Sequence, residues 1–262
     1  MISNLSNAIN QFYLKNKKIS LLRVLNTEKI TPRVQRIHFY CEDIEQYNHS
    51  EKLHIRLILR PEKVAAKDWL NTPANTKLKK LTDNYCIKRY TIRQIDTQQQ
   101  RITIDFVLHT ASIFCPGADW AAHASEGFTI GMIGPGVSDI KTADWYVLAG
   151  DETALPAIGR TLESLDHNAT GEIFIEVHNK DEKQNLLHPD TLNIHWLYRN
   201  GIDAKNSLLL YNAIEQLKLK PEACNPFIWV AGEVGVCNKI RTMAKRKFTL
   251  DKKRVQIAGH WQ

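Results

Sequence analysis

The sequence has no long apolar run and only five cysteines in 262 residues. No stretch reaches the roughly 20 consecutive apolar residues that a membrane-spanning helix needs, so we expect no membrane insertion. The first 18 residues lack the continuous apolar segment of a secretory leader and instead have the spacing of a short amphipathic helix. The cysteines are odd in number, scattered and without a CxxC pair. The sequence therefore predicts reduced thiols, a cytoplasmic location and no metal site.

Acidic residues are fewer than basic ones: the sequence has 28 Asp and Glu and 35 Lys and Arg, which gives a formal net charge of +7. Such a balance is compatible with nucleic acid, an acidic membrane surface or an anionic small molecule as partner. Much of the excess lies in 239–254, where Asp251 is the single acid. Aromatic residues are not interleaved there at stacking intervals, so we expect no nucleic-acid binding. A solvated basic helix face is the plain alternative.

The first half of the chain has the period of two that is typical of β-strands. Six short runs alternate apolar and polar residues and are separated by turn-forming or polar segments. They span residues 18–25, 34–41, 53–59, 85–95, 101–108 and 128–136. Several short strands at close spacing predict an antiparallel barrel or sandwich.

The second half alternates apolar strand-like runs with helical spacing. This alternation predicts βαβ units on a largely parallel sheet. We therefore predict a β-barrel plus α/β architecture with two domains. Residues 1–141 form an antiparallel six-stranded barrel with a short N-terminal helix, and residues 142–262 form a parallel-sheet nucleotide-binding domain.

The segment "IKRYTIRQID" at 87–96 sets three cations along one strand-like run. A buried unpaired charge is very costly, so this run does not belong in a core. Two readings stay open at this point: a solvated edge strand, or a strand that faces a flat anionic ligand.

Small residues and acids follow two strands of the second half, in "LAGDETALPA" and "VAGEVG". Ligands of open α/β sheets bind beyond the carboxyl ends of the strands, and the helix after Gly150 offers free N–H groups to an anion. Neither segment is a GxGxxG motif. In the barrel half, the small-residue turn at 116–118 leads into a short helix. By spacing alone, His109 and Trp120 are read as structural residues.

In their order along the chain, "KRYTIR", "DFVLH", "PGADWA", "GPG", "AGDETALPA", "WVAGE" and "GHW" resemble the siderophore-interacting protein family. These ferric-siderophore reductases are part of the wider ferredoxin-reductase-like flavoproteins. The resemblance covers about residues 19–261. It implies that the barrel carries FAD and that the α/β domain receives NADH or NADPH, so FAD would be the flat anionic ligand.

The resemblance also implies roles for individual residues. Tyr90 and Thr91 would contact the isoalloxazine and ribityl groups, and Arg93 the phosphate side. Lys88 stands where the family has arginine, with Arg89 beside it. The whole implied cofactor-binding set is Lys88, Arg89, Tyr90, Thr91, Ile92, Arg93, Val107, His109, Pro116, Gly117, Ala118, Trp120, Gly134, Asp151, Glu152, Thr153, Ala154, Glu233 and Trp261.

The implied reaction is reduction of a ferric siderophore with release of ferrous iron. A nicotinamide delivers two electrons as hydride, and a flavin divides them. The flavin carries the electrons, so we expect no catalytic side chain. Arg56, Lys141 and Lys247 are the candidates for binding the anionic siderophore, and we expect a monomer. Two alternatives remain: reduced ferredoxin as the electron donor, and a non-enzymatic protein that binds siderophore or nucleotide.

Overall fold

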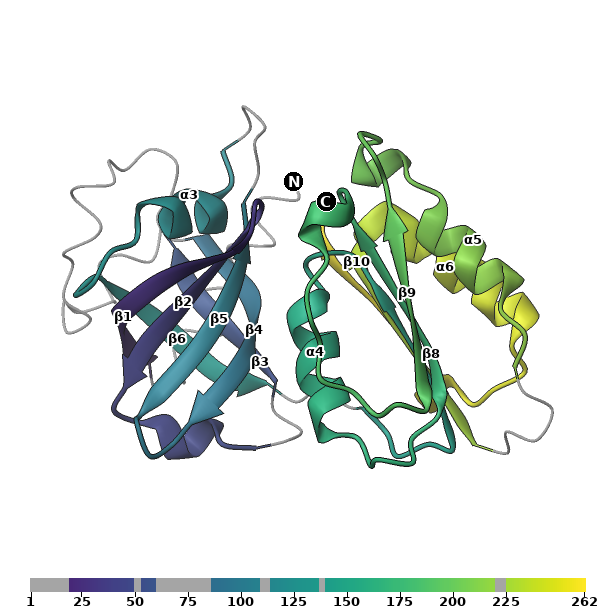
Figure 1. Ribbon diagram of the computed structural model, residues 1–262, viewed down its shortest axis with the longest axis horizontal. Helices are drawn as coiled ribbons and strands as arrows, with labels where there is room; N and C mark the ends of the chain where they lie inside the picture. The colour runs from purple at the N-terminus through teal and green to yellow at the C-terminus, as the bar shows by residue number, and fades with distance from the viewer. Residues whose placement is uncertain (1–18, 50–52, 60–85, 109–113, 137–139, 220–224) are drawn as a thin grey trace, which may run out of the picture. The chain divides into compact units, whose positions relative to one another are not determined.

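The computed structural model describes residues 19–49, 53–59, 86–108, 114–136, 140–219 and 225–262. These residues fall into two compact units, which divide between Ser138 and Asp139 (Figure 1). The expected N-terminal helix lies outside the described residues. In the described part of the chain, no helix is long and apolar enough to cross a membrane.

The first unit is a closed barrel of six strands, as predicted. Around the barrel the strands follow the order β1-β2-β5-β4-β3-β6, and every neighbouring pair is antiparallel. Their bounds are β1 Ile19–Thr31, β2 Val34–Cys41, β3 His54–Leu59, β4 Cys86–Asp96, β5 Arg101–Val107 and β6 Thr129–Gly136.

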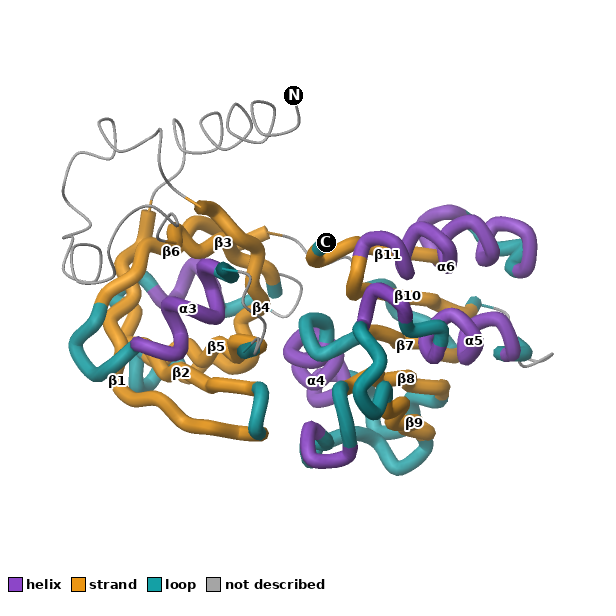
Figure 2. The backbone as a smooth tube through the Cα atoms, turned by 90° about the horizontal axis from the view of Figure 1, so that it is seen from above, coloured by secondary structure: helices purple, strands orange, loops and turns teal. Residues whose placement is uncertain are grey.

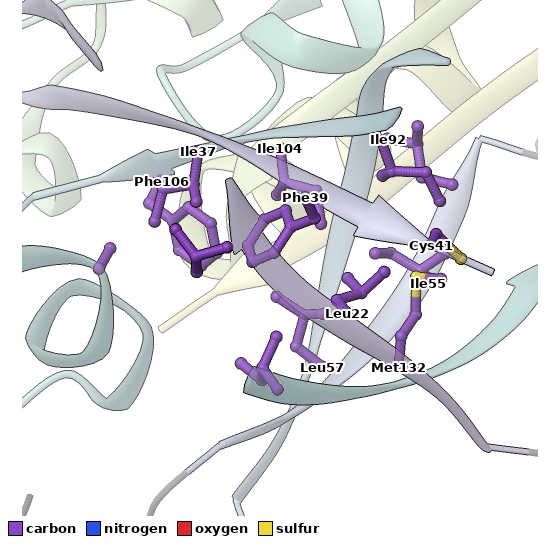
Figure 3. Packing of buried hydrophobic residues seen from close by; sticks show 14 of the residues in the cluster. Leu22, Ile37, Phe39, Cys41, Ile55, Leu57, Ile92, Ile104, Phe106 and Met132 are labelled. Carbon is purple, nitrogen blue, oxygen red and sulfur yellow. The ribbon is translucent and has the colours of Figure 1, made fainter. Parts of the chain in front are cut away.

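Alternating side chains of the strands fill the barrel. Leu22, Ile37, Phe39, Ile104 and Phe106 have no exposed surface and converge on the interior (Figure 3). Closing the sheet on itself leaves no edge strand, and the inward positions of an eight-strand or smaller barrel are filled by such side chains.

Two short helices complete this unit: η1 Ile44–Tyr47 and α3 Pro116–His123. Seen along the barrel, α3 lies across one end of it (Figure 2). Trp120 anchors the helix, because its ring centroid lies 6.0 Å from that of Phe39 and 5.8 Å from that of Phe106. The segment at 116–118, expected to be a turn, is the first turn of this helix.

The second unit is a parallel five-stranded sheet in the order β11-β10-β7-β8-β9. Its strands are β7 Trp145–Gly150, β8 Gly171–Val177, β9 Leu192–Tyr198, β10 Pro226–Glu233 and β11 Val255–Trp261. Its helices are α4 Leu155–Ser164, α5 Leu209–Gln216 and α6 Val234–Lys247, with the short helices η3 Lys180–Glu182, η4 Ala204–Asn206 and η5 Lys252–Arg254.

Helices cover both faces of this sheet. Helix α4 packs on one face, and α5 and α6 pack together on the other (Figure 1). Every residue of β7 and of β10 is buried as a result. Strands buried on both faces are continuous apolar runs, as "WYVLAG" and "FIWVAG" are. The carboxyl ends of β7 and β10 lie side by side, with Ala231 opposite Gly150.

Candidate functional site

Strand β4 carries the basic segment in the wall of the barrel, and the two halves of this segment differ in burial. Lys88 and Arg89 are exposed, whereas Thr91, Ile92 and Arg93 are buried, with Arg93 only 6% exposed. The register between β4 and β5 shifts between Ile92 and Gln94. A bulge re-aims the side chains at and after it, here Arg93 and Gln94. Because Thr91, Ile92 and Arg93 are buried and Lys88 and Arg89 are exposed, this segment is neither wholly solvated nor wholly core.

Tyr90 links β4 to the first turn of α3. Its ring centroid is 4.7 Å from that of Phe106, and a Cβ atom added to Gly117 would lie 1.7 Å from the Tyr90 hydroxyl oxygen. Only glycine fits at this position while Tyr90 keeps its place. Burial raises the pKa of Tyr90, with Cys115 and Cys86 adding to the effect, so the hydroxyl stays protonated.

The start of α3 is not capped by a side chain. Cys115 is the N-cap residue and makes no side-chain hydrogen bond to the helix, and Pro116 opens the first turn. The first N–H groups of a helix have no acceptor within it, so the Gly117 and Ala118 amides are available to an anion. Val107 ends β5 half-buried. His109 lies outside the described residues, and Trp120 is 2% exposed, as a packing residue would be.

The three candidate siderophore contacts lie on separate elements. Arg56 on β3 is the direct cross-strand partner of Arg89 on β4. Directly opposed like charges repel, and an anion against the pair would relieve that repulsion. Lys141 precedes β7, whereas Lys247 ends α6, where it donates to the main-chain oxygen of Glu215. Gly134 lies in β6 and precedes a cis proline.

The second group of predicted residues meets at the carboxyl edge of the parallel sheet, around Asp151. The Asp151 Oδ1 atom accepts from the Thr153 amide at 2.9 Å and from its hydroxyl at 2.5 Å. The other oxygen, Oδ2, accepts from Trp261 Nε1 at 2.8 Å. These bonds fasten the end of β11 to the turn between β7 and α4.

The Asp151 carboxyl is 4% exposed. Burial, helped by the neighbouring charge of Glu152, raises its pKa to about 6, although the bonds from Thr153 and Trp261 act in the opposite direction. Gly232, at φ +157°, makes room for it, because a Cβ there would lie 2.7 Å from Oδ2. Asp151 therefore changes its charge near neutral pH, which few aspartates do.

Glu152 belongs to a buried ion cluster. The Arg199 guanidinium donates to both of its oxygens, through Nη2 and, at 3.0 Å, through Nη1. Nη1 also lies 3.3 Å from Glu176 Oε1, and Glu176 Oε2 accepts from the Leu210 amide at 3.1 Å. Burial raises the pKa of Glu176 and would lower that of Arg199, but the two carboxylates outweigh burial at Arg199 and raise its pKa. Glu152 thus ties β7 to β8 and β9.

Glu233 and Ala154 also have clear structural tasks. Glu233 is the N-cap of α6, and its Oε2 accepts from the Val236 amide at 2.8 Å. Ala154 precedes α4 and packs on Gly150, where an added Cβ would lie 2.3 Å from the Ala154 Cβ. The structure therefore gathers Asp151, Thr153 and Trp261 into one network and gives Glu152 and Glu233 partners of their own.

Three residues of this edge were not predicted from the sequence: Glu176, Arg199 and His260. Charged Glu176 and Arg199 lie at the ends of apolar runs, "GEIFIEV" and "WLYR". A charged residue at the end of an apolar run was the available signal that these two side chains are buried, and buried charges are usually paired. His260 Nδ1 lies 3.3 Å from the Thr153 hydroxyl oxygen. The described residues contain no cluster of three or more His, Cys, Asp or Glu that could hold a metal ion.

Two family models match the chain. A siderophore-interacting FAD-binding domain matches residues 23–139, and a siderophore-interacting protein domain matches residues 143–262. A siderophore utilization protein from T. fusca is 33% identical, with a TM-score of 0.78 over 94% of this chain and 93% of that one. The chain belongs to the siderophore-interacting protein family.

Two further comparisons show a similar sequence and a similar fold. A ferric vibriobactin reductase of Vibrio cholerae is 34% identical over 177 residues, 67% of this chain. The match spans 64% of that reductase, so the chain covers just under two thirds of the curated relatives that it first matches. A ferredoxin-NADP+ reductase of Plasmodium falciparum, at 13% identity, has a TM-score of 0.65 over 92% of this chain and 95% of its own, so the fold is ferredoxin-reductase-like.

Proposed function

We propose that this chain is an FAD-dependent reductase of ferric siderophores that takes its electrons from NADH or NADPH. The observation that carries the proposal is the barrel site, where the uncapped start of α3 closes on Tyr90 beside the cations of β4. Family membership and the ferric vibriobactin reductase among its relatives support the same reaction.

The residues of the barrel fit FAD. Its pyrophosphate is an anion, and the amides of Gly117 and Ala118 would hold it at the start of α3. Arg93 would supply charge on the phosphate side, and Tyr90 and Thr91 would contact the isoalloxazine and ribityl groups. Bound FAD supplies the step from two-electron to one-electron chemistry. The part of these residues is to bind and orient it, so no general acid or nucleophile is required.

The carboxyl edge of the parallel sheet would receive the nicotinamide dinucleotide. Gly150 and Gly232 lie there without side chains, beside Asp151 and Thr153. Of the residues after β8, Glu182 is buried and Lys180 is exposed. An acid there favours a free ribose hydroxyl and a cation favours a 2′-phosphate. We propose NADH as the preferred donor and NADPH as the alternative.

An anionic ferric siderophore would approach the basic side of the barrel. Of the three candidate contacts, Arg56 is the one that the structure pairs with an implied cofactor residue, Arg89. A basic surface raises the rate at which an anionic chelate arrives. Arg56 is therefore the first of the three to test.

The decisive experiment is an absorption spectrum of the purified chain, followed anaerobically. A flavin spectrum that bleaches with NADH or NADPH and returns on addition of a ferric hydroxamate, with ferrous iron trapped by a chelator, is the expected result. A chain that binds no flavin even after reconstitution with FAD would refute the reductase and favour a siderophore- or nucleotide-binding protein.

A matched pair of variants tests the siderophore contact. Arg56→Ala should raise the KM for the ferric siderophore while the rate of bleaching by nicotinamide stays the same. Lys252→Ala, which removes an exposed cation from η5, should change neither. Equal KM values for Arg56→Ala and the unaltered chain would exclude Arg56 as a siderophore contact.

A second electron donor is favoured by the charges at the end of α6, where Lys245, Arg246 and Lys247 lie in the last turn. An acidic ferredoxin would bind such a surface with an affinity that falls steeply with salt. Flavin that stays oxidised with both nicotinamides but bleaches with reduced ferredoxin would replace the nicotinamide donor in the proposal.

A further inference from the structure

The hydrogen bonds at the carboxyl edge form a continuous path from a half-exposed imidazole to a buried carboxyl. His260 Nδ1 lies 3.3 Å from Thr153 Oγ1, which lies 2.5 Å from Asp151 Oδ1. Asp151 is 4% exposed, whereas Thr153 and His260 are both half-buried. Histidine and an aspartate with a raised pKa can both exchange a proton near neutral pH, and a hydroxyl can donate and accept at once.

We propose that His260, Thr153 and Asp151 form a proton relay, in which the Thr153 hydroxyl passes a proton between the imidazole and the buried carboxyl. The relay exists whether or not the proposed reductase activity does, but its use rests on that activity. Reduction of a bound flavin by hydride would consume one proton, and its reoxidation by two single electrons would release two.

Two hydrogen-bonding states of the relay differ only in where protons lie. In the first, the imidazolium donates from Nδ1 to Thr153 Oγ1, and the hydroxyl donates to the charged Asp151 Oδ1. In the second, Oδ1 holds a proton and donates to Oγ1, and the hydroxyl donates to Nδ1 of a neutral imidazole. Passing from the first to the second breaks one N–H and one O–H bond and forms two O–H bonds. No electron moves, and the net change is one proton from His260 to Asp151.

The surroundings direct the proton to one oxygen of Asp151. Trp261 Nε1 donates to Oδ2 at 2.8 Å, and an indole N–H cannot accept a proton in return. Oδ1 also accepts from the Thr153 amide at 2.9 Å, but it faces the Thr153 hydroxyl, which can accept as well as donate, so Oδ1 is the oxygen that exchanges the proton in the relay.

The other ionisable groups around Asp151 have partners of their own. Glu152 pairs with Arg199, and Glu233 caps α6. Burial, together with Asp151, raises the pKa of the Cys237 thiol to about 12, so it stays protonated, and Arg241 donates to the Ile257 carbonyl oxygen at 2.8 Å. Asp151 is thus the carboxyl of this network that lacks a cation partner among these groups and whose pKa burial raises to about 6.

The relay is tested by nuclear magnetic resonance on the isotope-labelled full chain with its flavin and without nicotinamide. The His260 ring nitrogens, assigned with His260→Gln, and the Asp151 carboxyl carbon, assigned with Asp151→Asn, are followed against pH. Coupled groups titrate as a pair. The His260 curve should therefore show an inflection that coincides with that of Asp151.

Two variants of Thr153 separate a relay from a mere structural clamp. Thr153→Val removes the hydroxyl at nearly equal volume, and the shared inflection should disappear. Thr153→Ser keeps the hydroxyl and should keep it. A His260 curve that is the same in Thr153→Val as in the unaltered chain would overturn the relay.

If Thr153→Val fails to fold, Asp151→Asn replaces it. In that variant the His260 curve should lose the shared inflection, and an unchanged curve would again overturn the proposal. The titration needs no turnover. A chain that titrates as expected but reduces no siderophore would keep the relay and refute the proposed function. A chain that reduces a ferric siderophore but has the same His260 curve in Thr153→Val would keep the proposed function and overturn the relay.

Discussion

Replacing Asp151 by asparagine should change how the stability of the protein depends on pH. The folded protein holds the Asp151 proton up to a pH of about 6, whereas the ordinary pKa of an aspartate is 3.8. Burial is the main cause, because a charged carboxylate loses its hydration in the 4%-exposed site. The native state therefore binds a proton more tightly than the unfolded chain does.

The sign and size of the effect follow from this difference. The stability that protonated Asp151 contributes is fully present below a pH of about 4 and is lost as the pH rises through about 6. One pH unit of difference is worth about 1.4 kcal/mol, so the loss is about 3 kcal/mol. Asparagine does not titrate. The free energy of unfolding of the unaltered protein, minus that of Asp151→Asn, should fall by about 3 kcal/mol across this range.

The assay is urea unfolding, followed by circular dichroism, at intervals from about pH 4 to about pH 7.5. Taking the difference between the two proteins cancels the titrations that the substitution leaves unchanged. An amide cannot accept the Trp261 and Thr153 bonds in the same way, which adds a loss that does not depend on pH. Asp166→Asn makes the same chemical change at a carboxyl with 73% exposure and is the control. A flat difference for Asp151→Asn would refute the reasoning from burial.

Three further substitutions test other contacts. Gly117→Ala should lower the free energy of unfolding by about 1–3 kcal/mol and lower the flavin-to-protein absorbance ratio, because the new methyl group overlaps the Tyr90 hydroxyl. Adding Tyr90→Phe to this variant should restore part of the stability, and no recovery would contradict this account. Arg199→Met leaves Glu152 and Glu176 buried without their cation and should cost about 3–5 kcal/mol in urea unfolding, with a smaller loss for Arg199→Lys. A loss below about 1 kcal/mol would show that the carboxylates find other partners. Glu233→Ala should lower the free energy of unfolding by about 0.5–2 kcal/mol, because it removes the cap of α6. Glu233→Gln should lower it less, because its amide oxygen can still accept from the Val236 amide. Equal losses in the two variants would argue against the cap.

Much of the fold could be predicted because its signals are local. Alternation in "VQRIHFYC" and "RITIDFVL" marks strands with one buried face, and both are strands with the expected bounds to within a residue. The fully apolar "WYVLAG" marks a strand buried on both faces. The order of the strands could not be predicted in this way. Pairing β3 between β4 and β6, and closing β1 on β6, depends on contacts between segments far apart in the chain.

The candidate site, too, could be predicted only in part from the sequence. Composition and spacing alone pointed to the basic run of β4, to the small-residue start of α3 and to the acids after β7 and β10. They could not show that Arg93 is buried while Arg89 is exposed, because burial depends on which distant segments pack against each part of β4. Nor could they pair Glu152 with Arg199, which is 47 residues away.

The sequence by itself determined that this protein combines a small barrel with a parallel α/β sheet, and which short segments carry polar groups at the strand ends. These properties depend on the periodicity of neighbouring residues. Only the tertiary structure decided what those groups do. Asp151 and Trp261, 110 residues apart, share a hydrogen bond because parallel strands bring their carboxyl ends to one edge. The burial that raises the pKa of Asp151 exists only once those strands and helices have packed.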